Sequence, residues 1–290
     1  MGSWPTVTPD RVPPFGPGPK FLIREPIILA LAPEDRQRAA SITVREMTQQ
    51  ICQRRLEFND VMRKNLVDLE SIEKAKCNAQ SLFVDQLSSG KISVKEDAMR
   101  GLVYLQARIP SEGGCMSQEV VQELHAEVSR FRNPDKGPGQ LRTCNAYSKR
   151  GNDIHWFPSP HVVPSSLAAR LKKHNYYVSK RSSFADPYTP EYVDFVCRCA
   201  ASLLYDIVDL HPFRDGNDLV AQLLTNNVLQ LVIPFPVTVS VGSLSESRGV
   251  YCDAKCREKN DGDLAALAAR ILEGLWRSWE GFAEVLDLDK

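Results

Sequence analysis

Two strongly apolar stretches of the chain are joined by the sequence His211-Pro212-Phe213-Arg214-Asp215-Gly216-Asn217. The stretch before it, residues 190–210, is apolar over most of a helical surface, which predicts a central, buried helix. The stretch after it, residues 218–231, predicts a second apolar helix that the prolines of residues 233–236 end. The sequence therefore predicts two core helices with a short polar loop between them.

The loop combines side chains that suit a reaction at a phosphate. The first N–H groups of the second helix have no helical partners, and the helix dipole favours an anion there. Gly216 lets the backbone approach a phosphate closely, and Asn217 can donate hydrogen bonds. Asp215 offers the hard oxygen ligand that Mg²⁺ prefers. His211 can accept a proton near neutral pH, so a base, a metal ligand and a phosphate site lie in one short segment.

This segment resembles the HPFx(D/E)GNGRxxR motif of the Fic (Fido) family, whose first seven positions it matches in full. Upstream, Gly139-Gln140-Leu141-Arg142 resembles the GxxR segment of the family. Residues 155–164 are similar to its target-docking flap, a hairpin that holds an extended piece of substrate by strand addition. The resemblance covers residues 95–240 in the family's order.

The resemblance implies an all-α Fic fold, a helical bundle with a small β-hairpin flap and an N-terminal helical extension. The expected regions are a disordered Pro/Gly-rich arm (1–31), the helical extension (32–93), the Fido core (94–245) and a C-terminal loop and helix (246–290). Residues 41–87 contain neither Pro nor Gly and predict two long amphipathic helices, or one long bent helix.

Shorter elements are expected around the core. Further helices are predicted over 94–107, over 117–131 with Ser117 as its cap, from 164 to about 173, and from 262 to about 286. Residues 140–164 predict a short hairpin or an irregular flap, and Val237-Thr238-Val239 predicts a small strand. A helix is also expected to begin at Ala32-Pro33-Glu34-Asp35.

The family implies transfer of a nucleotidyl group, most simply AMP from ATP with Mg²⁺. In this reaction His211 takes the proton of a Ser, Thr or Tyr hydroxyl on a target protein, and the oxygen attacks the α-phosphate. The resemblance assigns phosphate binding to Arg214, Gly216, Asn217 and Asp218, the metal to Asp215, structural roles to Pro212 and Phe213, and target docking to His155, Trp156, Phe157 and Pro158.

Three positions depart from the family motif: Asp218 stands for a Gly, Leu219 for an Arg and Gln222 for the last Arg. Losing two guanidinium groups removes bidentate phosphate contacts, and Asp218 adds a negative charge that repels a triphosphate. Asp218 also suits the first turn of a helix, which is a structural reason for its presence. The family's inhibitory (S/T)xxxE(G/N) helix has no match in the chain.

Three functions therefore stay open. The first is a transferase with altered or weakened triphosphate binding. The second is a catalytically degraded module that docks a protein through the flap. The third is a transferase whose donor is a diphosphate-linked metabolite with less charge to hold.

Composition excludes several classes of partner. Lys+Arg and Asp+Glu are both 36, so there is no basic excess for a nucleic acid or an anionic membrane. The apolar stretch 219–241 contains amides and two prolines, which a membrane helix rarely tolerates. The N-terminus shows no signal pattern, and the scattered cysteines suit a reducing compartment, so a cytoplasmic or nuclear location is expected. The spacings Cys197-x-Cys199 and Cys252-x3-Cys256 do not fit a standard zinc site.

Overall fold

The computed structural model describes residues 43–64, 66–88, 92–108, 116–130, 135, 137–150, 153–237 and 264–286. Its helices are α3 (Val44–Lys64), α4 (Leu69–Ser88), α5 (Ile92–Arg108), α6 (Gln118–Ser129), α7 (Val163–Ser179), α8 (Pro190–Leu210), α9 (Asn217–Leu229) and α11 (Ala265–Leu286). Two strands, β1 (Tyr147–Arg150) and β2 (Asp153–Trp156), and two 3₁₀ turns, η2 (Pro160–Val162) and η3 (Lys180–Ser183), complete the described part. The predicted all-α class with one small hairpin is confirmed for these residues.

Most helices predicted from apolar periodicity are present. Residues 41–87 hold a pair of helices, α3 and α4, and α8 has the predicted bounds. Ser117 caps α6, since its Oγ accepts the N–H of Val120 at 3.2 Å. Helix α7 is longer than predicted and runs to Ser179.

Some expectations fall outside the described residues. These are the arm over 1–31, the helix start at 32–35, the strand over 237–239 except Val237, the loop over 246–263, and Cys252 and Cys256. The division into four regions stays a prediction.

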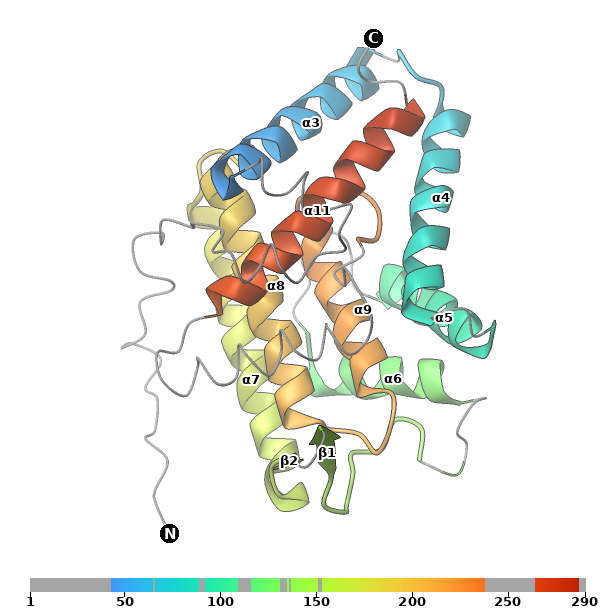
Figure 1. Ribbon diagram of the computed structural model, residues 1–290, viewed down its shortest axis with the longest axis vertical. Coiled ribbons are helices and arrows are strands. Elements are labelled where there is room, and N and C mark those ends of the chain that lie inside the picture. Colours follow the sequence, from blue (N-terminus) through green and yellow to red (C-terminus); the bar gives the residue numbers. More distant parts are fainter. Residues whose placement is uncertain are drawn as a thin grey trace.

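Helix α8 lies at the centre of the bundle and packs against α3, α7, α9 and α11 (Figure 1). It is buried on almost every side, as its nearly continuous apolar surface requires. Thr189 caps its first turn by accepting the N–H of Tyr192 at 3.3 Å, and Pro190 follows at a position where no N–H is needed. Helix α9 packs antiparallel against α8, so both ends of the polar loop are anchored in the core.

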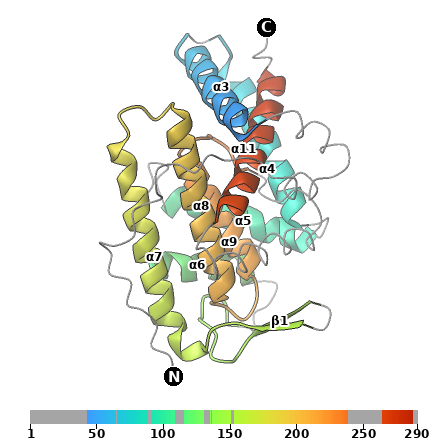
Figure 2. The ribbon, with the colours of Figure 1, turned by 60° about the vertical axis from the view of Figure 1, so that its left-hand side comes forward.

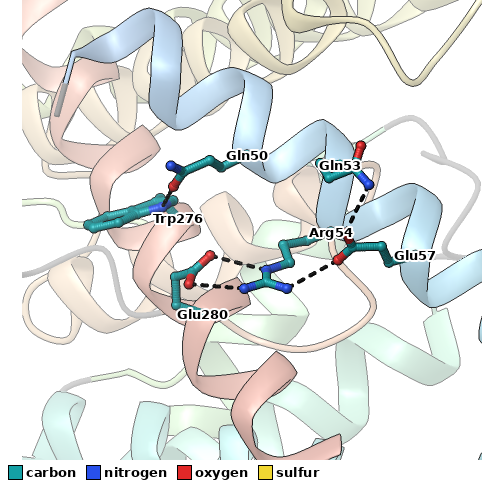
Figure 3. Close-up of polar contacts among 6 residues, drawn as sticks. All are labelled: Gln50, Gln53, Arg54, Glu57, Trp276 and Glu280. Carbon is teal, nitrogen blue, oxygen red and sulfur yellow. Dashed lines mark hydrogen bonds and ion pairs between the residues drawn. The ribbon is translucent and has the colours of Figure 1, made fainter. Parts of the chain in front are cut away.

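Helices α3 and α11 cover the far end of this pair. Trp279 is 1% exposed and its ring lies 5.5 Å from that of Phe235 and 6.0 Å from that of Phe58. Figure 3 shows the polar contacts between the two helices, in which Arg54 binds Glu280. This end of the bundle is therefore joined by both aromatic and ionic contacts.

The hairpin extends from the other end of the bundle (Figure 2). Its strands are antiparallel, with Tyr147 opposite Trp156 and Lys149 opposite Ile154. Because side chains alternate along a strand, Tyr147, Ile154 and Trp156 share one face, and all three are more than half exposed. Within the described residues the two strands form a sheet of their own, so each leaves one edge unpaired.

None of the helices in the described residues is long and apolar enough to cross a membrane.

Candidate functional site

The polar loop begins where α8 ends, at His211. This residue has φ 50° and ψ 60°, and it alone among the described non-glycine residues has a positive φ. Its N–H still donates to the carbonyl of Ile207 at 3.0 Å, so the left-handed residue closes the last turn of α8. Such a conformation costs on the order of 1 kcal/mol or more for a residue with a Cβ. The strain is concentrated at the residue that the sequence predicts as the base.

The side chain of Asn217 closes the loop on itself. Its amide nitrogen donates to the carbonyl of Phe213 and its amide oxygen accepts the N–H of Phe213, both at 2.9 Å. Asn217 is 2% exposed, so these bonds are protected from water. Sequence reasoning predicted that this amide binds phosphate, whereas in the structure both of its polar atoms bind the loop.

Gly216 sets the first turn of α9. It has φ 73° and ψ 6°, and a Cβ there would lie 3.3 Å from Oγ of Ser129. Its N–H donates to Oδ1 of Asp215 at 2.8 Å. The first helical bond of α9 runs from Val220 to the carbonyl of Gly216, so the N–H groups of residues 217–219 have no partner within the helix. These backbone N–H groups lie where the sequence predicts an anion site, which stays a prediction.

His125, in α6, is part of this site and was missed by the sequence analysis. It is 2% exposed, and its ring stacks on that of Phe213 with centroids 3.8 Å apart and planes 2° apart. Nδ1 accepts the N–H of Gly139 at 2.9 Å, so Nε2 carries the proton of the neutral ring and donates to the carbonyl of Asp215 at 3.0 Å. A single histidine in an amphipathic helix carries no sequence signal for this role.

Arg142, the last residue of the GxxR segment, is 4% exposed and binds carbonyl groups. Its Nε donates to His211 at 2.7 Å, and its terminal nitrogens donate to Cys144, Pro158 and Leu210. A cation at the carboxyl end of α8 is also favoured by the helix dipole. Burial lowers the pKa of Arg142, although the guanidinium stays charged at neutral pH. Arg142 thus joins His211 to the flap.

The predicted flap residues occupy different environments. The ring of Phe157 stacks on that of His211, with centroids 4.1 Å apart and planes 11° apart. The rings of His155 and Phe157 meet edge to face, with centroids 5.2 Å apart, and the carbonyl of Pro158 accepts a hydrogen bond from Arg142. Trp156 lies on the opposite face of the strand and is 60% exposed. The flap therefore covers the imidazole with one face and presents the other to solvent.

The charges around the site favour a neutral His211. Burial, and then the positive charge of Arg142, lower the pKa of His211 to about 4, while Asp215 opposes the shift. Arg214 and Asp218 are exposed, whereas Leu219 and Gln222 are 7% and 8% exposed within α9. No group of three or more His, Cys, Asp or Glu side chains in the described residues could hold a metal ion by itself.

Comparisons with known proteins agree with this arrangement. Residues 115–229, which include α6 and end with α9, match the Fic/DOC family. A Fido domain-containing protein of Dictyostelium discoideum is 27% identical over 133 residues, which cover 46% of this chain and 85% of that protein.

Two solved structures share the fold. A Fic domain-containing signaling protein from Bacteroides thetaiotaomicron superimposes with a TM-score of 0.62 at 14% identity, covering 81% of this chain and 96% of that chain. Fic-1 from C. elegans gives a TM-score of 0.62 at 18% identity, covering 89% of this chain and 77% of that chain. At these identities the likeness concerns the fold alone.

The first prediction concerns the protonation of His211. A histidine NMR titration, with His211→Ala to identify the signal, should give a pKa of about 4 in the wild type. Because the unfolded value is 6.5, the contribution of His211 to folding stability should decrease as the pH falls from 6.5 to 4. Phe157→Ala should raise the pKa by exposing the ring to water. A wild-type pKa of 6.5 or higher would contradict the burial argument.

The second prediction concerns the His125 junction. His125→Phe keeps an aromatic ring on Phe213 but leaves the N–H of Gly139 and the carbonyl of Asp215 without their partner. An unsatisfied buried group costs about 1–3 kcal/mol and these two groups are partly buried, so the free energy of unfolding in urea should fall by about 1–3 kcal/mol in total. The exposed His161 offers a control, since His161→Ala should change stability by less than about 0.5 kcal/mol. Equal stabilities of the two variants would show that the junction is not structural.

Proposed function

We propose that this chain, which carries a Fic/DOC family domain at residues 115–229, transfers a nucleotidyl group to a Ser, Thr or Tyr hydroxyl of a target protein. Members of this family typically transfer nucleotide groups to proteins, and AMP from ATP is the simplest reaction. The observation that carries the proposal is the closed loop between α8 and α9. It puts a neutral imidazole at one end and three helix N–H groups at the other.

The proposed reaction uses these groups as follows. His211 accepts the proton of the target hydroxyl, the hydroxyl oxygen forms a bond to the α-phosphorus, and the bond from that phosphorus to the pyrophosphate oxygen breaks. The N–H groups at the start of α9 stabilise the charge that develops on the phosphate oxygens. With its pKa near 4, His211 is unprotonated at neutral pH but is a weak base, which predicts slow transfer.

Asp215 fits the role of a Mg²⁺ ligand. Protein sites for this ion commonly use one or two carboxylates together with substrate phosphates and waters, so a single loop carboxylate suffices. Asp215 is partly exposed beside the anion site, although one of its oxygens accepts the N–H of Gly216. A bound ion would supply positive charge to the phosphates.

The triphosphate has few positive partners in the described residues. Leu219 and Gln222 replace the family's arginines at buried positions of α9, and Arg142 is committed to four carbonyl groups. Asp218 adds a carboxylate in the first turn. We infer that the β- and γ-phosphates are held weakly.

A docking module is the second candidate, and the hairpin favours it. The exposed side chains of Tyr147, Ile154 and Trp156 share one face, and both strand edges are unpaired among the described residues. An extended target segment can add to such an edge. In the transferase this docking brings the hydroxyl to His211, and in the module it is the whole function. The target protein and the expected cytoplasmic or nuclear location stay predictions.

The third prediction tests the transferase directly. Incubation of the wild type and of His211→Ala with ATP, Mg²⁺ and a cell extract should add AMP to proteins only in the wild-type reaction, as detected by mass spectrometry. The imidazole is the proton acceptor, so a fall of about 10²-fold or more is expected. Circular dichroism of His211→Ala should remain unchanged. Equal labelling by both proteins would exclude His211 as the base.

The fourth prediction concerns the departures from the motif. Calorimetry should show weak ATP binding by the wild type. Restoring Asp218→Gly, Leu219→Arg and Gln222→Arg should tighten binding about tenfold or more, because each charged hydrogen bond is worth about 1.5–3 kcal/mol. The single variant Asp218→Gly measures the repulsion between this carboxylate and the phosphates separately from the effect of the missing arginines. Tight binding by the wild type would contradict this account. The docking module would be favoured if the folded triple variant still binds ATP weakly and the protein captures a partner through residues 140–164.

A further inference from the structure

Two neighbouring arginines of α3 have opposite electrostatic surroundings. The guanidinium of Arg54 binds both oxygens of Glu280, at 3.3 and 3.4 Å, and Glu57 at 3.1 Å (Figure 3). Arg55 is only 8% exposed and forms no ion pair with any carboxylate of the described residues. Its hydrogen bonds go to the carbonyl oxygens of Pro187 and Leu231, at 2.5 and 3.5 Å.

Several N–H donors of the Arg55 guanidinium therefore have no acceptor among the described residues. A guanidinium carries five N–H donors, and the two carbonyl groups leave several of them over. The rings of Tyr188 and Tyr192, with centroids 4.7 and 5.8 Å from the guanidinium carbon, stabilise the cation in part. A buried cation that no carboxylate contacts directly is costly. Burial lowers the pKa of Arg55, and the more distant carboxylate of Asp186 only partly opposes this shift. An anion beside it would offset this cost.

A cleft of about 160 Å³ opens beside Arg55. The rings of Phe58 and Trp279 line it together with the amides of Asn59 and Gln230. A wider hollow of about 560 Å³ shares Asn59 and Tyr188 with this cleft. The amide of Asn59 donates to the hydroxyl of Tyr188, so this pair lies between the two spaces. The inner cleft thus combines one cation, neutral hydrogen-bonding groups and aromatic walls.

We propose that the cleft binds a small organic carboxylate, with the anionic group on Arg55 and an apolar or aromatic body against Phe58 and Trp279. A single buried arginine matches one negative charge, and the fork of its N–H groups fits a carboxylate. The aromatic walls favour an organic acid over inorganic phosphate. The cleft lies by the first residues of α8, and at 1.5 Å per residue this helix places His211 about 30 Å away. The site is therefore separate from the loop.

The test uses the indole N–H signal of Trp279, one of four tryptophans, identified with Trp279→Phe. Titration of the full chain with phenylacetate or butyrate should shift this signal, whereas the neutral phenylacetamide and inorganic phosphate should not. Arg55→Met should weaken phenylacetate binding about tenfold or more, as the loss of a charged hydrogen bond implies. Arg54→Met removes the same charge from the same helix and should leave the affinity within about twofold.

Arg55→Lys is a second variant in case Arg55→Met fails to fold. Lysine keeps the positive charge but lacks the paired N–H donors of the guanidinium. Its affinity for phenylacetate should lie between those of the wild type and Arg55→Met, with circular dichroism unchanged. The proposal is overturned if phenylacetate leaves the Trp279 signal in place, or if phenylacetamide or phosphate shifts it equally. It is also overturned if the folded Arg55 variants bind as well as the wild type.

Discussion

The buried ring of His125 joins three segments that are far apart in the sequence, and the geometry of the site depends on this junction. The ring stacks on Phe213, accepts the N–H of Gly139 and donates to the carbonyl of Asp215. It thereby fixes the middle of the loop against α6, and the Asn217 amide then closes the loop around Phe213. This closure sets the positions of Gly216 and of the first turn of α9. The proposed chemistry at a phosphate would require such a backbone site to be formed in advance.

A second buried group, Arg142, organises the other half of the site. It holds the carbonyl groups at the end of α8 and the carbonyl of Pro158 at the end of the flap. The flap is therefore anchored so that Phe157 covers His211. The same contact that positions the imidazole also withdraws it from water and lowers its pKa. The contacts that fix the position of the His211 ring therefore also reduce its basicity.

The sequence predicted α3 because its apolar residues recur at helical spacing, and it predicted α8 and α9 because both stretches are apolar over most of their surface. It predicted the loop because the motif residues are contiguous. It did not predict His125, whose partners are 14 and 90 residues away and whose own helix is ordinary. It grouped four flap residues that strand alternation assigns to opposite faces. The sequence did not separate Arg54 from Arg55, because the bidentate partner of Arg54, Glu280, lies in α11 and is 226 residues away.

The central claim is that the start of α9 still binds the phosphates of a nucleotide beside His211. Titration of the wild type with ATP and Mg²⁺, followed by the backbone amide NMR signals of residues 217–219, tests it most directly, because such shifts report weak binding. The account predicts that these signals and the His211 ring signal move together, with an affinity in the millimolar range. Shifts confined to other parts of the chain, or none at saturating ATP, would contradict it.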